Sequence, residues 1–332
     1  GTSTQAARAS FGASVPLVIL GQRGAAIRAS EADLATVHVE TEVAWTDVRA
    51  GAAHAFVALW IAERTAAARA DAAVLTQRLE NTITERVALG AAPELDALRA
   101  RAERLRADAD AAQAKELVFA AGGDLARWMG TVDGAMLRAA GAPDVPAAPP
   151  PFNDLVAQLG VNPAIRREVA DAQAAAARAS RERALNRPAL SLDVGTDVGD
   201  PTLNGTNYRA QLGIEVPIFN QRGAFIEREN AAFGAAKARE SVERTRARAA
   251  LEVAYRTFAA ATARSNALLV GVVPAADAAA VATEESYTLG RAQLVAVLDV
   301  ERVRIESRLT LLDALAARAN AWIDVEHAVG QP

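Results

Sequence analysis

The side chains that could carry catalysis or bind a metal are few and scattered in this 332-residue sequence. Its three histidines, His38, His54 and His327, show neither the HExxH spacing of a metalloprotease nor a close histidine pair. The sequence contains no cysteine, which excludes disulfides, thiolate metal sites and cysteine nucleophiles. We therefore predict no metal site and no cofactor.

Motifs for nucleophilic catalysis and phosphate binding are equally weak. Ser191 and Ser286 lack the glycine elbow and the neighbouring base that activate a serine. The glycine pairs at residues 21–24 and 122–123 lack the lysine of a phosphate loop and are more typical of turns. The chain is therefore not predicted to be an enzyme.

The composition points instead to long contacts between helices. Alanine supplies about a quarter of the residues, and hydrophobic residues reach 51% although aromatics make up only 5%. Small side chains let helices approach closely but bury little area each. The net charge is −4 with both signs interspersed, so no basic patch indicates a nucleic-acid partner. No apolar run approaches the roughly 18 residues of a membrane helix.

The two halves of the sequence repeat each other at a distance of about 200 residues. Three stretches match in one register: Val15-Pro16-Leu17 with Val216-Pro217-Ile218, Gln22-Arg23-Gly24-Ala25 with Gln221-Arg222-Gly223-Ala224, and Leu89-Gly90 with Leu289-Gly290. A proline-rich stretch, which cannot continue a helix, separates the halves. We therefore predict a first repeat at residues 1–141, a linker at 142–152 and a second repeat at 153–332.

The first repeat lacks the opening elements that the second repeat has. The second half predicts a helix, two strands, a long helix and a return helix, whereas the first half predicts only the last strand and the two helices that follow. We therefore expect a signal peptide, a helix and a strand equivalent to about residues 163–198 upstream of this chain. Without that strand, residues 8–18 would lack their hairpin partner and leave an unpaired edge.

The predicted strands alternate strictly between apolar and polar residues. The apolar set is Leu190, Leu192, Val194, Thr196 and Val198, then Tyr208, Ala210, Leu212, Ile214, Val216 and Ile218, with Phe11, Ala13, Val15 and Leu17 in the first half. Runs of about ten residues can cross a bilayer as tilted strands. A hairpin on a soluble core alternates in the same way. The flanking helices are too long to form a compact core under so small a sheet, which favours membrane strands.

Long helical hairpins complete each repeat. No proline interrupts residues 25–89 or 224–273, and the first run would extend roughly 95 Å as a helix. Return helices are predicted at about residues 93–137 and 291–329, after turns at Gly90 and Gly290. The predicted fold class is mainly α with β: long antiparallel α-helical hairpins attached to short antiparallel β-strands, with an internal two-fold repeat.

Residues 216–223, which lead from strand to helix, and the hairpin turns at residues 89–98 and 287–299 resemble the TolC-like outer-membrane efflux family. The resemblance covers about residues 11–330. It implies a homotrimeric channel in the cell outer membrane whose strands pool into one β-barrel and whose helices form a periplasmic tunnel. It also implies two partners, a periplasmic adaptor protein and an inner-membrane efflux pump that delivers substrates to this passive duct.

The hairpin turns are the candidate sites that the resemblance points to. The predicted adaptor-docking residues are Gly90, Leu95, Leu98, Tyr287, Gly290, Leu294 and Leu298, through exposed small and apolar groups. The predicted pore constriction comprises Asp96, Arg99, Arg291 and Asp299, since rings of charge set selectivity and gating. The alternatives are that these leucines only close their own hairpins and that the charges are solvated.

Two other functions stay open at this point. A soluble coiled-coil scaffold without a pore would show regular heptads, and an adaptor-like protein would carry one hairpin flanked by β domains. The Gln-Arg-Gly stretches resemble the heavy-metal branch of the family, so the expected substrates are heavy-metal cations or other small toxic compounds.

Overall fold

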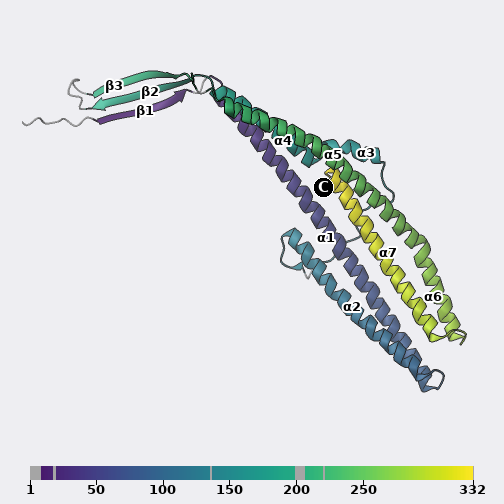
Figure 1. The fold of residues 1–332 in the computed structure, drawn as a ribbon. Coiled ribbons are helices and arrows are strands. Elements are labelled where there is room, and N and C mark those ends of the chain that lie inside the picture. The colour runs from purple at the N-terminus through teal and green to yellow at the C-terminus, as the bar shows by residue number, and fades with distance from the viewer. Residues whose placement is uncertain (1–8, 18–19, 135–136, 199–205, 220, 332) are drawn as a thin grey trace, which may run out of the picture. The chain divides into compact units, whose positions relative to one another are not determined.

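The computed structural model describes residues 9–17, 20–134, 137–198, 206–219 and 221–331. They form long helices and a single small antiparallel sheet, which confirms the predicted fold class (Figure 1). The strands are β1 (Ala9–Leu17), β2 (Ala189–Val198) and β3 (Thr206–Glu215). The helical elements are α1 (Gln22–Ala88), α2 (Glu94–Met129), α3 (Phe152–Gln158), η2 (Leu159–Val161), α4 (Pro163–Leu185), α5 (Gly223–Ala267), η3 (Leu268–Val272), α6 (Val273–Thr288) and α7 (Leu294–Val329).

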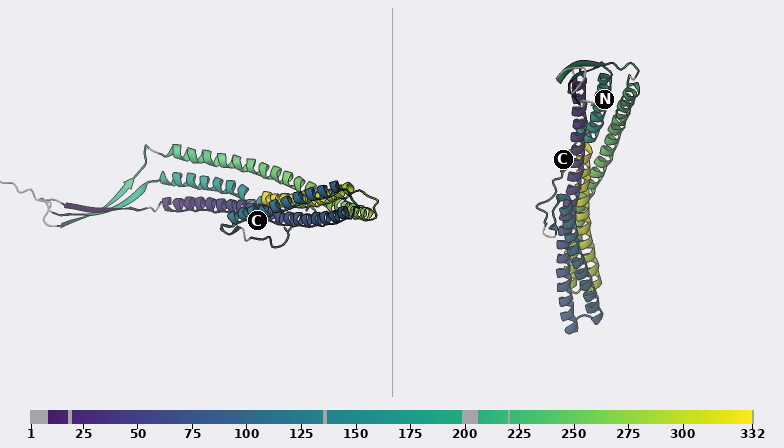
Figure 2. Two further views of the ribbon diagram at one scale, coloured as in Figure 1. Left: turned by 90° about the horizontal axis from the view of Figure 1, so that it is seen from below. Right: turned by 90° about the vertical axis from the view of Figure 1, so that its left-hand side faces the viewer.

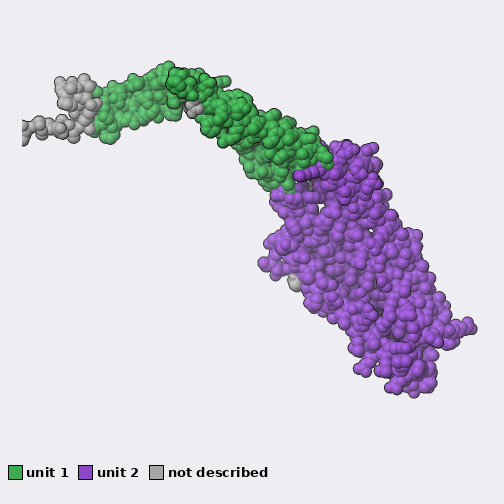
Figure 3. All heavy atoms as spheres, viewed as in Figure 1, with its two compact units in different colours: residues 1–43, 163–245 green, residues 44–162, 246–332 purple. Residues whose placement is uncertain are grey.

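The chain forms two compact units, and each unit takes segments from both halves of the sequence (Figure 3). Unit 1 consists of residues 1–43 and 163–245, and unit 2 of residues 44–162 and 246–332. The units therefore cut across the predicted repeats. The repeat boundaries at residues 141 and 153 stay a prediction about duplication in the sequence.

In unit 1 the strands form an antiparallel sheet in the order β1-β2-β3. β2 pairs along its whole length with β3 and along nine residues with β1. The prediction that residues 8–18 would leave an unpaired edge is therefore only partly correct. β1 is a terminal strand of the described sheet, but its inner edge is paired with β2, because β2 has a second edge that its own hairpin leaves free.

The helical part of unit 1 brings α4 together with the first turns of α1 and of α5, and α4 lies between the other two (Figure 2). Most of its buried positions are alanine, which lets backbones approach closely. The buried alanines of α4 are Ala170, Ala172, Ala174, Ala175, Ala179 and Ala184. Arginine–carboxylate pairs, rather than large apolar side chains, fill the remaining contacts between these helices.

Unit 2 contains both predicted hairpins, α1–α2 and α6–α7. The turn glycines Gly90 and Gly290 have left-handed φ values of 69° and 71°, as a glycine past a helix end requires. α2 ends at Met129, before the predicted residue 137, because Gly130 adopts the same left-handed conformation. α7 begins at Leu294 rather than at residue 291.

One local prediction in unit 2 is wrong. The glycine pair at residues 122–123, predicted as a turn, lies inside α2, where Gly122 packs against the backbone carbonyl of Gly134. Pro274, which follows the proline-free run at residues 224–273, lies in the first turn of α6 directly after the π-helical turn η3.

One helical stretch, Gly223–Thr288, is long and apolar enough in composition to cross a membrane, with a mean hydropathy of 1.5 over 18 residues. The sequence analysis considered only uninterrupted apolar runs. A segment rich in alanine and valine keeps a high mean hydropathy even when it contains an aspartate. Length and composition of one helix do not by themselves show a membrane span, so we assign no membrane helix.

Candidate functional site

The sheet of unit 1 has one apolar face that its own unit leaves exposed. Strand register places the apolar residues in four rows across the three strands: Phe11–Thr196–Tyr208, Ala13–Val194–Ala210, Val15–Leu192–Leu212 and Leu17–Leu190–Ile214. Tyr208 is 86% exposed and Leu212 is 61% exposed. The predicted alternation is therefore confirmed. A soluble sheet normally buries its apolar face, so this face needs another apolar environment.

The opposite face of the sheet is polar and charged. Its rows are Ser10–Asp197–Asn207, Gly12–Gly195–Arg209 and Ser14–Asp193–Gln211. Arg209 Nη1 binds Asp197 Oδ2 at 3.3 Å. A side chain at Gly195 would begin 3.0 Å from the backbone oxygen of Phe11, so glycine at this position allows β1 and β2 to pair closely. Apolar residues on one face and charged residues on the other are typical of strands between lipid and water.

The tips of the two hairpins in unit 2 pack against each other. One buried cluster joins Ile83 of α1 and Ala100 of α2 to residues of the other hairpin, namely Tyr287, Leu294, Val297 and Leu298. The guanidinium of Arg86 also lies 4.8 Å from the centre of the Tyr287 ring. Gly90 and Gly290 are therefore at the same end of unit 2, as the resemblance implies (Figure 1).

The predicted docking residues divide into an exposed and a buried group. Gly90, Leu95, Leu98 and Gly290 are exposed. The predicted exposure is wrong for Tyr287, Leu294 and Leu298, which are buried, Leu294 to 2% exposure, because they form the seam between the hairpins.

Two exposed leucines at the tips were missed by the sequence reasoning. Leu89 is 83% exposed and Leu289 is 67% exposed, each directly before its turn glycine. The repeated Leu-Gly pair, which was used only to align the two halves, was the signal that could have identified them.

The charged tip residues form separate local ion pairs. Asp96 Oδ1 lies 3.9 Å from Arg99 Nη1 within α2. Asp299 Oδ1 lies 3.6 Å from Arg302 Nη1 within α7, and Arg302 also binds Glu103 of α2. Arg291 is exposed at the second turn. Arg302 was missed in the sequence, and near the tips it provides a charged contact between the hairpins.

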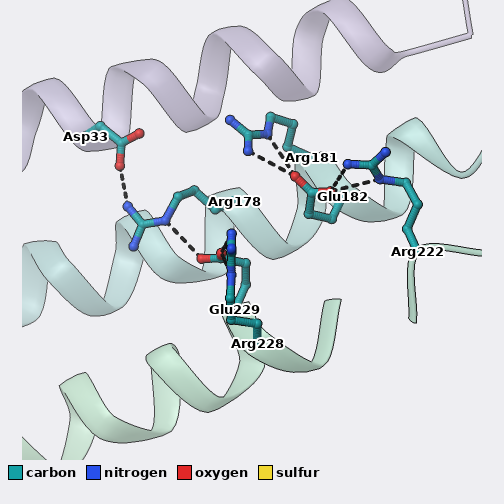
Figure 4. A network of polar contacts seen from close by, with 7 residues as sticks. All are labelled: Asp33, Arg178, Arg181, Glu182, Arg222, Arg228 and Glu229. Atoms are coloured by element: carbon teal, nitrogen blue, oxygen red, sulfur yellow. Dashed lines mark hydrogen bonds and ion pairs between the residues drawn. The ribbon is translucent and has the colours of Figure 1, made fainter. Parts of the chain in front are cut away.

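A buried glutamate anchors the passage from β3 to α5. Glu182 of α4 is 3% exposed, and its Oε2 accepts hydrogen bonds from Arg222 Nε at 2.8 Å and Nη2 at 2.6 Å. Its Oε1 accepts a hydrogen bond from Arg181 Nη2 at 2.9 Å. Burial raises the pKa of Glu182, but the bonds from Arg222 and Arg181 outweigh it, so the pKa lies below its ordinary value. Figure 4 shows both arginines converging on this carboxylate.

Both Gln-Arg-Gly stretches contact the part of the chain that runs from α4 to β2. Arg222 has a left-handed φ of 52°, a strained conformation for a residue with a side chain. In the first copy, Gln22 Nε2 donates to the carbonyl oxygen of Pro188 at 3.1 Å. The Gln-Arg-Gly stretches, used in the sequence to align the two halves, therefore fix each strand-to-helix passage.

Arg178 joins the three helices of unit 1. Its Nε donates to Glu229 Oε2 at 3.0 Å, and its Nη1 binds Asp33 of α1 (Figure 4). Burial raises the pKa of Glu229, but hydrogen bonds from Arg228 and Arg178 lower it below its ordinary value. These charges position helices, and each carboxylate has its positive partners in place.

The histidines of unit 2 join α1 to α7. His54 Nδ1 lies 2.9 Å from Asn320 Oδ1, and His54 Nε2 lies 3.1 Å from Asp324 Oδ1. His327 Nε2 lies 2.9 Å from Asp47 Oδ1. Within the described ranges, no three or more histidine, aspartate or glutamate side chains gather in a way that could hold a metal ion.

The sequence of this chain matches a known protein family. Residues 156–331 match the sequence profile of the outer membrane efflux protein family. The chain belongs to this family.

Related proteins extend the match to nearly the whole chain. The cobalt-zinc-cadmium resistance protein CzcC of Cupriavidus metallidurans is 23% identical over 319 residues, which are 96% of this chain and 76% of CzcC. The structure of CusC superposes with a TM-score of 0.81 at 18% identity, over 98% of this chain and 78% of CusC. The outer membrane protein VceC of Vibrio cholerae gives 0.78 at 18% identity, over 97% of this chain and 79% of VceC. These structures share the fold of this family member.

Proposed function

We propose that this chain is the outer-membrane channel component of a tripartite efflux system, a passive duct for substrates delivered from the inner membrane. The observation that carries the proposal is the sheet, whose exposed apolar face suits lipid while its charged face suits a water-filled lumen. Family membership supports the location in the outer membrane and the role in efflux.

The channel is proposed to be a homotrimer. Three described strands cannot close a barrel, since the smallest membrane barrels need about eight. The terminal positions of β1 and β3 leave edges for further strands. Several copies of the chain could together supply enough strands to close a barrel and could pair the edges of β1 and β3. The resemblance to TolC-like channels favours three copies.

Most of the chain is proposed to lie in the periplasm, where the hairpin tips meet the adaptor protein. Leu89, Leu289, Leu95 and Leu98 supply exposed apolar contacts, while Gly90 and Gly290 allow a close approach. Tyr287, Leu294 and Leu298 support this surface from beneath. The proposed pore constriction keeps Asp96, Arg99, Arg291 and Asp299, because three copies of each would form rings of charge.

Heavy-metal cations are the proposed substrate class. This proposal rests on the name of CzcC, a cobalt-zinc-cadmium resistance protein with which the chain aligns over 96% of its length. Other small toxic compounds are the alternative. Export of each metal from cells that lack their own channel, measured with and without this protein, separates the two.

Labelling of single cysteines tests the membrane assignment of the sheet. The chain has no cysteine, so Leu212→Cys and Gln211→Cys each introduce a single labelling position on opposite faces of β3. In lipid vesicles, a fluorophore at position 212 should be quenched by lipid-borne quenchers, and one at position 211 by water-soluble ions. Equal water access at both positions would favour the soluble scaffold instead.

Substitution at the tips tests adaptor docking. Leu289→Glu changes an exposed residue and should leave assembly intact while abolishing crosslinking to the adaptor and export. Leu294→Glu places a charge in the buried seam and should disturb folding first. Export that persists in a folded Leu289→Glu protein would contradict the docking assignment.

A further inference from the structure

Five arginines lie where the strands of unit 1 meet its helices. Three segments pass between sheet and helices there: residues 20–30 enter α1, residues 183–192 lead from α4 into β2, and residues 216–226 lead from β3 into α5. These segments contain no carboxylate and no lysine, although the whole chain has a net charge of −4. Their five arginines, here called the arginine collar, are Arg23, Arg28, Arg183, Arg187 and Arg222.

Hydrogen bonds hold the three segments together. Arg187 Nη1 donates to the carbonyl oxygen of Leu20 at 2.8 Å, which joins the start of β2 to the start of α1. Arg183 Nη2 donates to Asn230 Oδ1 at 3.0 Å, which joins the end of α4 to α5. Both acceptors are neutral, so these bonds join the segments without cancelling the charge of either arginine.

Carboxylates of the chain leave most of this positive charge unpaired. Arg23 and Arg28 are exposed, and neither forms an ion pair in the part of the chain that the structure describes. Arg222 does pair with a carboxylate, but it shares Glu182 with Arg181. Four of the five arginines in the collar therefore have no carboxylate partner among the described residues.

The helices that begin at the collar add to its positive charge. Arg23 lies in the first turn of α1 and Arg222 directly precedes α5, and neither helix has an acidic residue in its first turn. The N-terminal end of a helix carries a partial positive charge and is normally stabilised by aspartate or glutamate. Arginine at these two positions therefore disfavours the helix ends, unless an anion from outside the chain lies beside them.

Exposed apolar side chains surround the same passages. Phe219 is 99% exposed, and it follows the apolar face of the sheet, whose last row is Leu17–Leu190–Ile214. Apolar side chains next to basic ones are typical of positions between lipid and water, where long basic side chains reach the headgroups. The exposed apolar residues of the passages include Leu20, Leu185, Val216, Ile218, Phe219 and Phe225.

We propose that the arginine collar binds the headgroups of anionic phospholipids at the membrane surface where the strands end. Arginine pairs with phosphate through two parallel hydrogen bonds, while the neighbouring apolar side chains enter the acyl chains. A free phosphate ion would satisfy the arginines but would leave Phe219 in water, so a lipid fits both observations. The inference rests on the proposed function, because that function places the sheet in a membrane.

Energy transfer to labelled lipids tests the proposal on full-length protein in vesicles that mix phosphatidylcholine and phosphatidylglycerol. The chain has no cysteine, so Ile218→Cys can carry the donor beside the collar. The acceptor is attached to one lipid or to the other. Transfer to phosphatidylglycerol should exceed transfer to phosphatidylcholine, and the excess should fall as salt is added, because salt screens the attraction.

Matched variants test the arginines. Arg23→Gln combined with Arg28→Gln removes two exposed charges and keeps the bonds of Arg187 and Arg183. It should lower the ratio of the two transfers several-fold, since one arginine beside an anionic surface strengthens the attraction by about fivefold. Arg101→Gln removes an exposed arginine of α2, outside the collar, and should leave the ratio unchanged.

The outcomes separate this inference from the proposed function. Equal transfer to both lipids would overturn the inference and leave the membrane position of the sheet intact. A donor at Leu212→Cys that transfers to neither lipid would contradict the proposed function and remove the basis of the inference with it. An unchanged lipid ratio together with loss of oligomers in the double variant would mean that carboxylates of a neighbouring copy pair with the collar, which would also overturn the inference.

Discussion

The buried carboxylate of Glu182 gives a quantitative prediction about the junction between the sheet and the helices. The change is Glu182→Gln, which keeps the size of the side chain and removes its charge. Glu182 holds Arg222, at the end of the β3-to-α5 passage, and Arg181 of its own helix. Loss of the charge should therefore weaken the attachment of α5 to α4 in unit 1.

The magnitude follows from the contacts. A hydrogen bond to a charged group contributes about 1.5–3 kcal/mol. The side chains of Arg222 and Arg181 are 31% and 36% exposed, so water re-solvates both guanidinium groups in the variant and offsets part of the loss. Glutamine can still accept one hydrogen bond through its amide oxygen. We expect unfolding free energy to fall by about 2 kcal/mol at pH 7.

The effect should depend on pH in a defined direction. The pKa of Glu182 is lowered from its ordinary value of 4.5 in the folded protein. Its contribution to stability is therefore fully present above about pH 4.5 and is lost as the pH falls through the folded pKa. The difference between wild type and Glu182→Gln should shrink over that acidic range.

The assay is unfolding in detergent, followed by circular dichroism between pH 7 and pH 3. Glu227→Gln, an exposed glutamate in the first turns of α5, is the matched control and should change the midpoint little. An unchanged midpoint for Glu182→Gln at pH 7, or a difference that stays constant at acidic pH, would refute the reasoning.

Substitutions at three further places test the packing by the same unfolding assay. Because Arg222 has a φ of 52°, Arg222→Gly should be more stable than Arg222→Ala by about 1 kcal/mol, and the reverse order would contradict the strain. Ile83→Ala leaves a cavity at a fully buried position between the hairpin tips and should lower the free energy of unfolding by about 2–5 kcal/mol. A loss below about 1 kcal/mol would mean that the two tips do not pack against each other. Gly122→Ala would place a carbon 2.3 Å from the carbonyl oxygen of Gly134 and should destabilise α2, whereas Gly123→Ala meets no atom within 4 Å and should stabilise it by about 1 kcal/mol.

The predictions that the structure confirms rest on the alternation of apolar and polar residues and on single residues with a local conformational preference. The sheet faces follow from strict alternation, and the strand register keeps the predicted apolar residues that lie within β1, β2 and β3 on one side. Val216 and Ile218 lie beyond the end of β3 at Glu215. The hairpin turns follow from Gly90 and Gly290, whose conformation needs no tertiary contact.

Contacts between distant segments could not be predicted. Alanine-rich helices carry no distinct apolar stripe, so nothing local marked Leu294 as buried and Leu95 as exposed. The bond between Glu182 and Arg222 depends on how α4 and α5 align, which no residue spacing specifies. The early end of α2 was missed because the predicted helix was extended past Gly130, whose left-handed conformation ends it.

Ion conductance across a planar lipid bilayer tests the central claim most directly. Purified full-length protein should insert and give stable conductance steps. A bulky positively charged thiol reagent should reduce the conductance of the Gln211→Cys variant, whose side chain is predicted to face the lumen, and leave that of Leu212→Cys unchanged. Absence of conductance from folded protein, or equal effects of the reagent at both positions, would contradict the assignment of this chain as an outer-membrane channel.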